Sequence, residues 1–396
     1  MSIKGKAYLM GAFEHPLRDA PDTSTPQLHA ECARGALIDA GLTKDDVDGY
    51  FCAGDAPGFG GLSMVDYMGL KNVRHLDSTE TGGSSYIVHV GHAAQAIAAG
   101  KCSVALITLA GRPRHGGRRP GAGMAPGGGG GLTDGPPEAG FENIYGGSTH
   151  NTYGMCAMRH MHQYGTTSEQ LAWIKVAASH HAQWNAHAML REVVTVEEVL
   201  ASPIIASPLH RLDCCVISDG GGAVIVVSPE VARSLKRPLV KIIGSAEAPK
   251  GPRGGGGLDL TFSAGAWSGP AAFAEAGVTP ADIKYASIYD SFTITVLMQL
   301  EDLGFCAKGE GGKFVADGAL ISGVGKLPFN TDGGGLCNNH PTNRGGITKV
   351  IEAVRQLRGE AHPKVQVPSC DLAIAHGTGG SLGARHGAAT LIMERE

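Results

Sequence analysis

The apolar residues of the chain follow two patterns that alternate along the sequence. Short continuous apolar runs predict buried strands, and apolar residues spaced three or four positions apart predict helices. Strands are predicted at residues 7–13, 47–52, 73–77, 102–109, 222–228, 240–244 and 387–393, and helices at 25–40, 86–99, 153–188, 271–276 and 347–358. This alternation is typical of a mixed α/β fold.

Capping residues indicate where two of these helices begin. Thr25 stands directly before Pro26, so we expect Thr25 to be the cap and Pro26 the first helical residue. Ser168 is expected to cap a helix within the long helical stretch at 153–188.

Residues 112–147 interrupt the regular pattern. They contain Arg112, Arg114, Arg118 and Arg119 and the glycine run 127–131, and they are too rich in glycine and proline for a packed element. We expect either a mobile lid or a disordered loop here, within a loop region of about residues 111–200.

Two segments far apart in the chain share one pattern. Residues 36–47 and 272–283 each show the end of a helix, an Ala-Gly stop, an apolar residue, threonine, and an aspartate before a β-branched residue. Gly41 then matches Gly277, and Asp46 matches Asp282. Two copies of one α/β unit imply pseudo-twofold halves, predicted at residues 1–235 and 236–396, with a functional site at their junction.

Composition and charge exclude several classes of protein. The 396 residues are 42% hydrophobic and 18% charged, which is typical of a globular protein with a sizeable core. The net charge of −4 gives no electrostatic support for nucleic-acid binding. No apolar run reaches the roughly 18 residues of a membrane span, and the N-terminus lacks the apolar core of a signal peptide.

The cysteines and histidines show no metal-binding spacing. Nine cysteines without a C-x-x-C pair indicate reduced thiols and a cytoplasmic protein. The histidine-rich region lacks cysteine or carboxylate partners at ligand spacing, so no metal site is predicted. It comprises His160, His162, His180, His181 and His187.

The stretch at residues 330–346 carries the first candidate for chemistry. A glycine run, which lets a backbone approach a ligand closely, leads to His340 and Pro341 and then to the helix at 347–358. A histidine on such a stiffened turn can serve as a general base, because its ordinary pKa lies near neutrality. A solvent-facing turn histidine is the competing interpretation.

Taken together, several stretches resemble the thiolase superfamily, in its sterol-carrier-protein-X and lipid-transfer-type branch. The matching stretches are the helix and strand at 93–109, residues 164–171, 195–203 and 212–220, Tyr289-Asp-Ser-Phe292, Asn339-His-Pro341, and the glycine loop 376–380. The resemblance covers almost the whole chain. It implies a five-layered αβαβα sandwich, usually as a homodimer.

The chain departs from this family at the catalytic nucleophile. Thiolases carry a cysteine at the start of the long buried helix, where the helix dipole favours the thiolate. The equivalent position here is Gly83, and the adjacent Ser84 and Ser85 are far weaker nucleophiles without a base beside them. The family's second cysteine is also missing, and His376 stands near its place.

The remaining residues suffice for a reaction without a covalent intermediate. His340 or Tyr289 can act as the base, while Asp290 is expected to hold a turn and His376 is a further candidate. Backbone N–H groups of the two glycine loops can stabilise an oxyanion; these are at Gly83, Ser84, Gly379 and Gly380. This set supports retro-aldol cleavage of a β-hydroxyacyl-coenzyme A.

The resemblance is strongest to the steroid side-chain aldolases of this branch, through residues 212–215, 289–292 and 303–310. Those enzymes carry a tyrosine near the position of His340, so the choice of base between Tyr289 and His340 stays open. The resemblance also implies a small zinc-ribbon/OB-fold partner protein. No cofactor is expected beyond the coenzyme A of the substrate.

Two other functions remain open at this point. The first is a thiolase-type acyltransferase whose nucleophile is Cys337, a serine or a cysteine of a partner subunit, and the second is a non-catalytic subunit that binds lipid or acyl-CoA. In each case basic residues can bind the phosphates of coenzyme A. The candidates are Arg112, Arg114, Lys250 and Arg253.

Overall fold

Strands from both halves of the chain join into one large mixed sheet. The computed structural model describes residues 2–115, 148–251, 259–341, 345–380 and 386–396. In this part of the chain the strand order is β3-β2-β4-β7-β1-β8-β11-β10-β9, and β5 and β6 form a separate pair. The strands are β1 (Tyr8–Glu14), β2 (Gly49–Phe51), β3 (His75–Asp77), β4 (Val104–Gly111), β5 (Ile204–Ala206), β6 (Leu209–His210), β7 (Gly220–Val227), β8 (Val240–Lys250), β9 (Tyr285–Ile288), β10 (Leu372–Gly380) and β11 (His386–Arg395).

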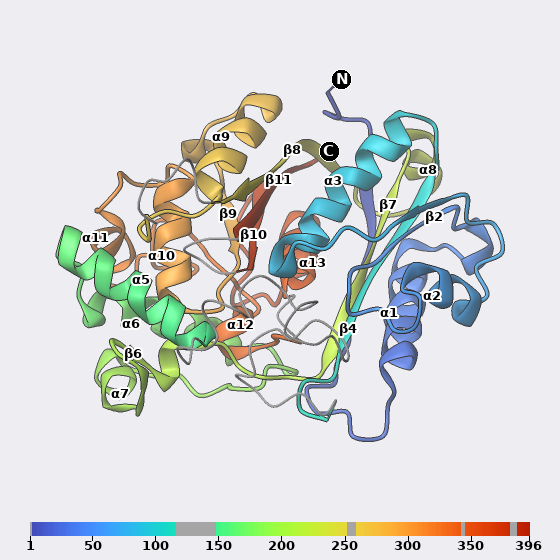
Figure 1. Cartoon of the computed structure of the whole chain (residues 1–396). Helices are drawn as coiled ribbons and strands as arrows, with labels where there is room; N and C mark the ends of the chain where they lie inside the picture. Colours follow the sequence, from blue (N-terminus) through green and yellow to red (C-terminus); the bar gives the residue numbers. More distant parts are fainter. Residues whose placement is uncertain (1, 116–147, 252–258, 342–344, 381–385) are drawn as a thin grey trace.

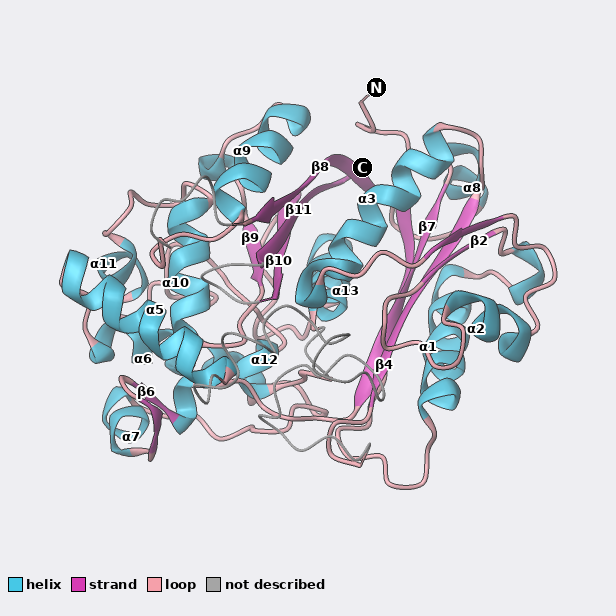
Figure 2. Ribbon diagram, viewed as in Figure 1, coloured by secondary structure: helices cyan, strands magenta, loops and turns pink. Residues whose placement is uncertain are grey.

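The helices form three layers around the two arms of this sheet (Figure 1). Two helices lie between the arms, α3 and α13, and their apolar side chains share one buried cluster. α1 and α2 cover the outer face of the first arm, and α9 and α10 that of the second (Figure 2). The helices are α1 (Thr25–Ala40), α2 (Gly61–Met68), α3 (Ser85–Ala98), α5 (Thr149–Tyr164), α6 (Ser168–Ala182), α7 (Val196–Ala201), α8 (Pro229–Ser234), α9 (Gly265–Ala276), α10 (Thr293–Asp302), α11 (Gly311–Val315), α12 (Gly334–Cys337) and α13 (Gly346–Arg358).

This arrangement confirms the predicted αβαβα sandwich. The two arms meet where β1 pairs with β8, through only two residue pairs, whereas β1 pairs with β7 through six. The short junction lets the sheet open into two arms with α3 and α13 between them. The first residues of both central helices therefore lie at the contact between the halves, where the sequence places its candidate site.

The internal repeat has the same structure in both halves. α1 ends at Gly41 and α9 at Gly277, each in the left-handed conformation with φ of 74° and 71°. A one-turn 3-10 helix follows in each half, and the carboxylate of Asp46 or Asp282 accepts the backbone N–H of the threonine three residues before it, at 2.8 Å. A strand, β2 or β9, comes next. The pattern read from residues 36–47 and 272–283 thus corresponds to a matched helix–turn–strand unit.

The structure corrects the starts of two predicted helices. Ser24, not Thr25, caps α1, since its hydroxyl accepts the backbone N–H of Gln27. Thr167, not Ser168, caps α6 in the same way, through the N–H of Gln170. The stretch predicted as helical at 153–188 also contains two helices, α5 and α6, separated by Gly165 in the left-handed conformation.

The expected C-terminal glycine loop is a strand in this chain. Residues 376–380 belong to β10, which pairs in parallel with β9 on one side and antiparallel with β11 on the other. Side chains of a strand alternate between its two faces. A side chain at position 377 would face α3, at Ile87, whereas the ring of His376 lies on the opposite face, against Gly265 of α9.

Candidate active site

Tyr289 and His340 form a buried pair at the junction of the two halves. Tyr289 follows the last residue of β9, and its backbone N–H donates to the carbonyl of His376, at 2.9 Å. Its hydroxyl oxygen lies 2.9 Å from Nε2 of His340, and the two ring centroids are 5.5 Å apart. Tyr289 is 4% exposed and His340 6%. The structure therefore brings the two predicted bases into direct contact.

Ser218 fixes the backbone of His340. Its hydroxyl oxygen accepts the N–H of His340 at 2.9 Å and donates to the side-chain oxygen of Asn339 at 2.8 Å. Ser218 is fully buried, just before β7. The first half of the chain thus holds the histidine that the second half supplies.

Glu14, at the end of β1, anchors the residues before His340. One of its carboxylate oxygens accepts N–H groups from the side chains of Asn338 and Asn339, at 2.9 and 3.0 Å. Burial would raise the pKa of Glu14, but the charges of Arg18 and Arg355 lower it to about 2. The carboxylate is therefore ionised at neutral pH and accepts these hydrogen bonds in its charged form.

Asp290 connects Tyr289 with the segment that carries His340. Its carboxylate accepts the backbone N–H groups of Gly335 and Leu336, at 2.8 and 3.2 Å, and the Nζ of Lys349 on α13 at 2.7 Å. Asp290 and Lys349 are both buried. The Asp290 carboxylate thus points at these donors rather than at the hydroxyl of Tyr289.

The ring of Tyr289 fills the space beside Gly83. A Cβ built on Gly83 would lie 2.5 Å from Cζ of Tyr289 and 2.6 Å from its hydroxyl oxygen, and it would also collide with the carbonyl of Thr378. These separations are far below van der Waals contact. The Tyr289 hydroxyl therefore stands at the position that a side chain of residue 83 would take.

The serines after Gly83 are held by local hydrogen bonds. The hydroxyl of Ser84 donates to the carbonyl of Thr81 at 2.9 Å, and that of Ser85 donates to the carboxylate of Glu80 at 3.3 Å and accepts the N–H of Thr81. Neither hydroxyl contacts a histidine in the described part of the chain. This geometry does not activate either serine as a nucleophile.

The two glycine segments predicted as oxyanion donors pack against each other. A Cβ on Gly379 would collide with the carbonyl of Thr81 and lie 2.6 Å from the N of Gly83. A Cβ on Gly82 would lie 2.9 Å from the N of Gly380. Only glycine permits this approach. The start of α3 and the end of β10 thus form one wall beside Tyr289.

The structure separates His376 from the Tyr289–His340 pair. Its Nδ1 lies 2.8 Å from the hydroxyl of Thr390 on β11, and its ring packs under the first residue of α9. Burial, together with the charge of His386 when that ring is protonated, lowers the pKa of His376 to about 3. His376 is a neutral core residue on the far face of β10, so it does not reach the reacting position.

Burial also decides the protonation state of Tyr289. Removal from water raises its pKa well above the ordinary value, and Cys215 and Tyr153 nearby raise it further. The phenol is therefore protonated at neutral pH. Tyr289 can donate its proton, and it can accept another only as it gives its own away.

The basic residues proposed for coenzyme A have other partners. Lys250 is buried, and its Nζ donates to the carbonyls of Asp259 and Phe262, at 2.5 and 2.7 Å. This burial corrects its assignment as a phosphate ligand. Arg112 donates to the carbonyls of Ala20 and Pro21, and Arg114 to that of Ile217. Arg118, Arg119 and Arg253 lie outside the described residues.

Two other features of the surface lie apart from this chemistry. Asp19, His115 and Asp219 offer ligand atoms within 4.8 Å of one another, but the His115 ring already pairs with Asp19, and both Asp219 oxygens accept backbone N–H groups.

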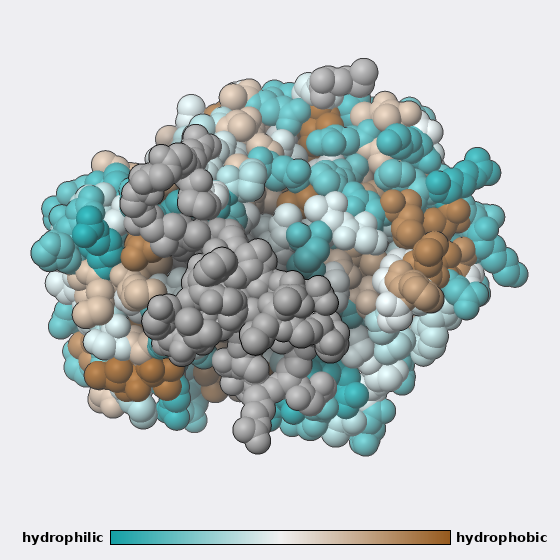
Figure 3. Space-filling view, viewed as in Figure 1, coloured by the Kyte–Doolittle hydropathy of each residue, from teal (hydrophilic) through white to brown (hydrophobic). Residues whose placement is uncertain are grey.

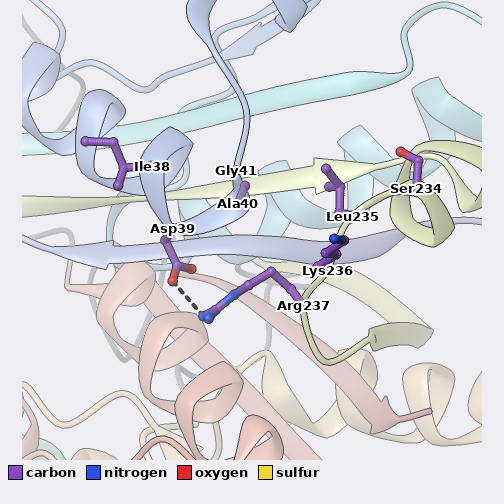
Figure 4. A pocket seen from close by; sticks show the side chains of 8 residues that line it. All are labelled: Ile38, Asp39, Ala40, Gly41, Ser234, Leu235, Lys236 and Arg237. Carbon is purple, nitrogen blue, oxygen red and sulfur yellow. Dashed lines mark hydrogen bonds and ion pairs between the residues drawn. The ribbon is translucent and has the colours of Figure 1, made fainter.

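A surface pocket also lies apart from the candidate site. This pocket, shown in Figure 4, lies between the end of α1 and the turn before β8, where Asp39 and Arg237 form an ion pair. Its lining contains neither Tyr289 nor His340.

Sequence reasoning missed the residues that hold the pair in place. Ser218, Glu14 and Lys349 carry no pattern that separates them from ordinary polar residues. Ser218 lies in the stretch 212–220 that resembles the thiolase superfamily, and this was the one available signal.

The chain shares sequence with enzymes that act on acyl-CoA thioesters. The family model described as Thiolase C-terminal domain-like matches residues 257–395. The chain is 36% identical, over 90% of its length and 91% of the relative's, to the steroid side-chain-cleaving aldolase of Thermomonospora curvata. It is 34% identical, over 90% and 92%, to the 17-hydroxy-3-oxo-4-pregnene-20-carboxyl-CoA lyase of Mycobacterium tuberculosis.

A solved structure and a partial relative extend this comparison. The structure described as Ltp2-ChsH2(DUF35) aldolase superposes with a TM-score of 0.87 at 31% identity, covering 99% of this chain and 98% of that one. An acetyl-CoA acetyltransferase of Methanothermobacter thermautotrophicus is 40% identical, but over only 58% of this chain and 60% of that protein.

Proposed function

Because the chain belongs to the thiolase superfamily, in the family of the steroid side-chain-cleaving aldolases, we propose that it cleaves a β-hydroxyacyl-coenzyme A by a retro-aldol reaction. The observation that carries this proposal is the position of Tyr289. Its hydroxyl stands beside Gly83, where a thiolase has its nucleophile, and contacts His340. A proton-transferring pair thus occupies the place of a covalent catalyst.

The pair can move the proton that a retro-aldol reaction requires. The Tyr289 oxygen accepts the proton of the substrate's β-hydroxyl while its own proton passes to Nε2 of His340, 2.9 Å away. The electron pair of the O–H bond forms the new carbonyl at Cβ, and the Cα–Cβ bond breaks. Its electrons become the enolate of the thioester, and Cα then takes a proton back through the same pair.

In this mechanism the negative charge develops on the thioester oxygen. The backbone N–H groups near Gly83, Ser84, Gly379 and Gly380 are proposed to stabilise it. The products are a ketone and a shortened acyl-CoA, and no acyl-enzyme forms. In this mechanism His340 is the final proton acceptor, and Tyr289 is the group that contacts the substrate.

The experiment is turnover of a β-hydroxyacyl-CoA by Tyr289→Phe and His340→Ala. Each variant should lose about a hundredfold or more in kcat, as is typical of a lost general acid–base group, while the thioester still binds. The first substrate to test is the compound for which the M. tuberculosis relative is named. Tyr164→Phe and His187→Ala, at positions outside the site, are the matched controls.

The acyltransferase alternative has a separate test. Cys337 is its candidate nucleophile in this chain, but the sulfur contacts Lys175 on α6 rather than the space beside Gly83. Incubation with acyl-CoA followed by intact mass measurement should show no stable acyl adduct. An adduct, together with full activity of both site variants, would establish the acyltransferase instead.

The proposal includes a small partner protein of the zinc-ribbon/OB-fold type. The related aldolase structure is described as an assembly of Ltp2 with ChsH2(DUF35), which supports a partner protein here. Co-expression with such a protein should raise the soluble yield or the activity. If both stay unchanged, the chain acts without it.

A further inference from the structure

A buried lysine and a buried cysteine contact each other beside the active site. Lys175 lies on α6 and is 1% exposed, and Cys337 is the last residue of α12 and is fully buried. Nζ of Lys175 lies 3.1 Å from Sγ of Cys337 and 2.7 Å from the carbonyl oxygen of Leu336. Within α12 a side chain at Gly335 would face the ring of His340, whereas Cys337, two residues on, faces α6.

Ordinary ion pairing does not account for this lysine. No carboxylate in the described part of the chain lies within 4.0 Å of its Nζ, and the nearby Asp290 is paired with Lys349 instead. A buried ammonium without an ion partner is costly. All nine cysteines are free thiols, and among the described contacts Cys337 is the one whose sulfur bonds a lysine. Nζ of Lys175 and Sγ of Cys337 are therefore placed to react with each other.

We propose that Lys175 and Cys337 form an oxidative modification site, at which peroxide joins Nζ to Sγ through one oxygen atom. Such a bridge tethers α6 to α12, the short helix that precedes His340. It spans 162 positions of the sequence. This site is independent of the reaction proposed above.

The chemistry balances with hydrogen peroxide as the oxidant. The sulfur first attacks one peroxide oxygen, the O–O bond breaks, and a sulfenic acid and water form. A second peroxide then removes two electrons from the nitrogen, which reacts as the neutral amine after its third proton has passed to solvent. The sulfenic oxygen bonds to Nζ, and two waters leave. One thiol, one amine and two peroxides thus give one S–O–N bridge and three waters.

The geometry favours an inserted oxygen over a direct bond. From the present separation of 3.1 Å, an oxygen between the two atoms requires only a small approach, whereas a direct S–N bond requires a much closer approach of two packed helices. Burial raises the pKa of Cys337, although the charge of Lys175 works in the opposite direction. The bridge therefore forms slowly. Large oxidants such as glutathione disulfide do not reach the sulfur.

The test is peptide mapping of the wild-type protein after treatment with hydrogen peroxide. We expect a linked peptide pair containing residues 175 and 337, heavier than the two peptides by one oxygen and lighter by two hydrogens, and separated again by dithiothreitol. The bridge should also raise the unfolding midpoint by a few degrees, because it closes a long loop. Dithiothreitol should reverse this shift.

Variants separate this site from general oxidation. Cys337→Ser and Lys175→Arg should abolish the linked pair, and Cys370→Ser, at a buried cysteine whose neighbouring charges are Asp371 and Arg395, should keep it. Sulfinic or sulfonic acid at Cys337 without a link overturns the proposal, as does a link that lacks the oxygen. Mapping of the wild-type protein decides the matter even if a variant fails to fold.

Discussion

The ring of Tyr289 occupies the space that a side chain at position 83 would need. The phenol stands where any side chain of residue 83 would be, at 2.5 and 2.6 Å from the position of its Cβ. The space that glycine frees at this position is therefore not open to a substrate, because the Tyr289 ring fills it.

The first prediction at the scale of residues concerns Gly83→Ala. The added methyl group must displace the Tyr289 ring or the Thr378 carbonyl, so both stability and turnover should fall, with a cost of about 1–3 kcal/mol, as is typical of overpacking. Chemical denaturation and steady-state kinetics measure the two effects. Gly251→Ala is the matched control, since a Cβ there meets no atom of the described residues within 4 Å. Equal behaviour of the two variants would contradict the packing described here.

Candidate residues could be named from the sequence where they stand in a recognisable motif. Tyr289 and His340 were both named as candidate bases, and the structure places them in contact. His376 was misplaced because its motif was expected to form a loop, and a strand sends alternate side chains to opposite faces. Lys250 was misjudged because its positive charge suggested that it binds a phosphate of coenzyme A, whereas its Nζ donates hydrogen bonds to two backbone carbonyls. The contact partners that decide such roles come from distant parts of the chain.

At the scale of elements, a single ion pair couples β9, α12 and α13. Lys349 on α13 pairs with Asp290, which follows Tyr289 and accepts the N–H groups of Gly335 and Leu336 in α12. Burial would lower the pKa of Lys349, but Asp290 and Asp332 raise it. The lysine is therefore charged, and removing it leaves a buried carboxylate unpaired.

Lys349→Met should destabilise the protein strongly. Breaking a buried ion pair by removing one partner costs about 3–5 kcal/mol, whereas an exposed pair contributes roughly 1 kcal/mol or less. Lys313→Met is the control, since Lys313 pairs with Glu310 at 74% side-chain exposure. Urea denaturation of the two variants gives the comparison. A loss for Lys349→Met as small as that of the control would show that the pair does not hold these elements.

A second ion cluster predicts a pH dependence of stability. His92 on α3 contacts Asp77 of β3 at 2.7 Å and Glu247 of β8 at 3.2 Å. The hydrogen bonds to Asp77 and Glu247 raise the pKa of His92 to about 9. The folded state thus keeps the proton to higher pH than the unfolded chain, whose histidine has a pKa of about 6.5. This stabilisation is complete below the unfolded value and is lost as the pH rises through the folded one.

Thermal unfolding between about pH 6 and 9.5 checks this expectation. The midpoint of the wild-type protein should fall across this range more steeply than that of His92→Gln, which cannot be protonated. His75→Gln provides a control at a partly exposed histidine of β3, the strand that carries Asp77. Parallel curves for the wild type and His92→Gln would rule out a contribution from this cluster.

The helices and strands were predicted more accurately than the residues at which they begin and end. The apolar runs located β1, β2, β3, β4, β7, β8 and β11 but missed β10, whose end was expected to form a loop. The repeat at 36–47 and 272–283 fixed the matching helix–turn–strand units. The caps were displaced by one residue, since neighbouring Ser and Thr residues at 24–25 and 167–168 are chemically equivalent in the sequence. Which one caps depends on where the backbone turns, and tertiary packing decides that.

At the scale of the whole molecule, one edge of the sheet carries exposed apolar side chains. β3 is the terminal strand of the first arm, and Leu76 on it contacts the start of α2. Together with Phe59, Leu62 and Tyr67 it forms what we term the edge patch, with exposed fractions from 36% to 89%. Figure 3 shows brown areas at the right of this view, on the side where α2 and β2 lie. An unpaired edge with apolar neighbours fits the predicted homodimer.

The corresponding variant is Leu62→Glu. A charge in the edge patch should turn a dimer into a monomer, as measured by light scattering during size-exclusion chromatography. Val324→Glu, at another exposed apolar residue outside the patch, should leave the mass unchanged. A wild-type protein that is already monomeric would remove the basis for this assignment. No helix among the described residues is long and apolar enough to span a bilayer.

The shared volume of Gly83 and Tyr289 also constrains how such a protein changes its chemistry over evolutionary time. A cysteine at position 83 collides with the tyrosine, and loss of the tyrosine alone removes the proposed acid–base pair without supplying a nucleophile. The effect of a change at one of these two positions therefore depends on the residue at the other. Descent between a cleavage enzyme of this kind and an acyl-transferring ancestor therefore requires both changes together, or an inactive intermediate preserved by gene duplication.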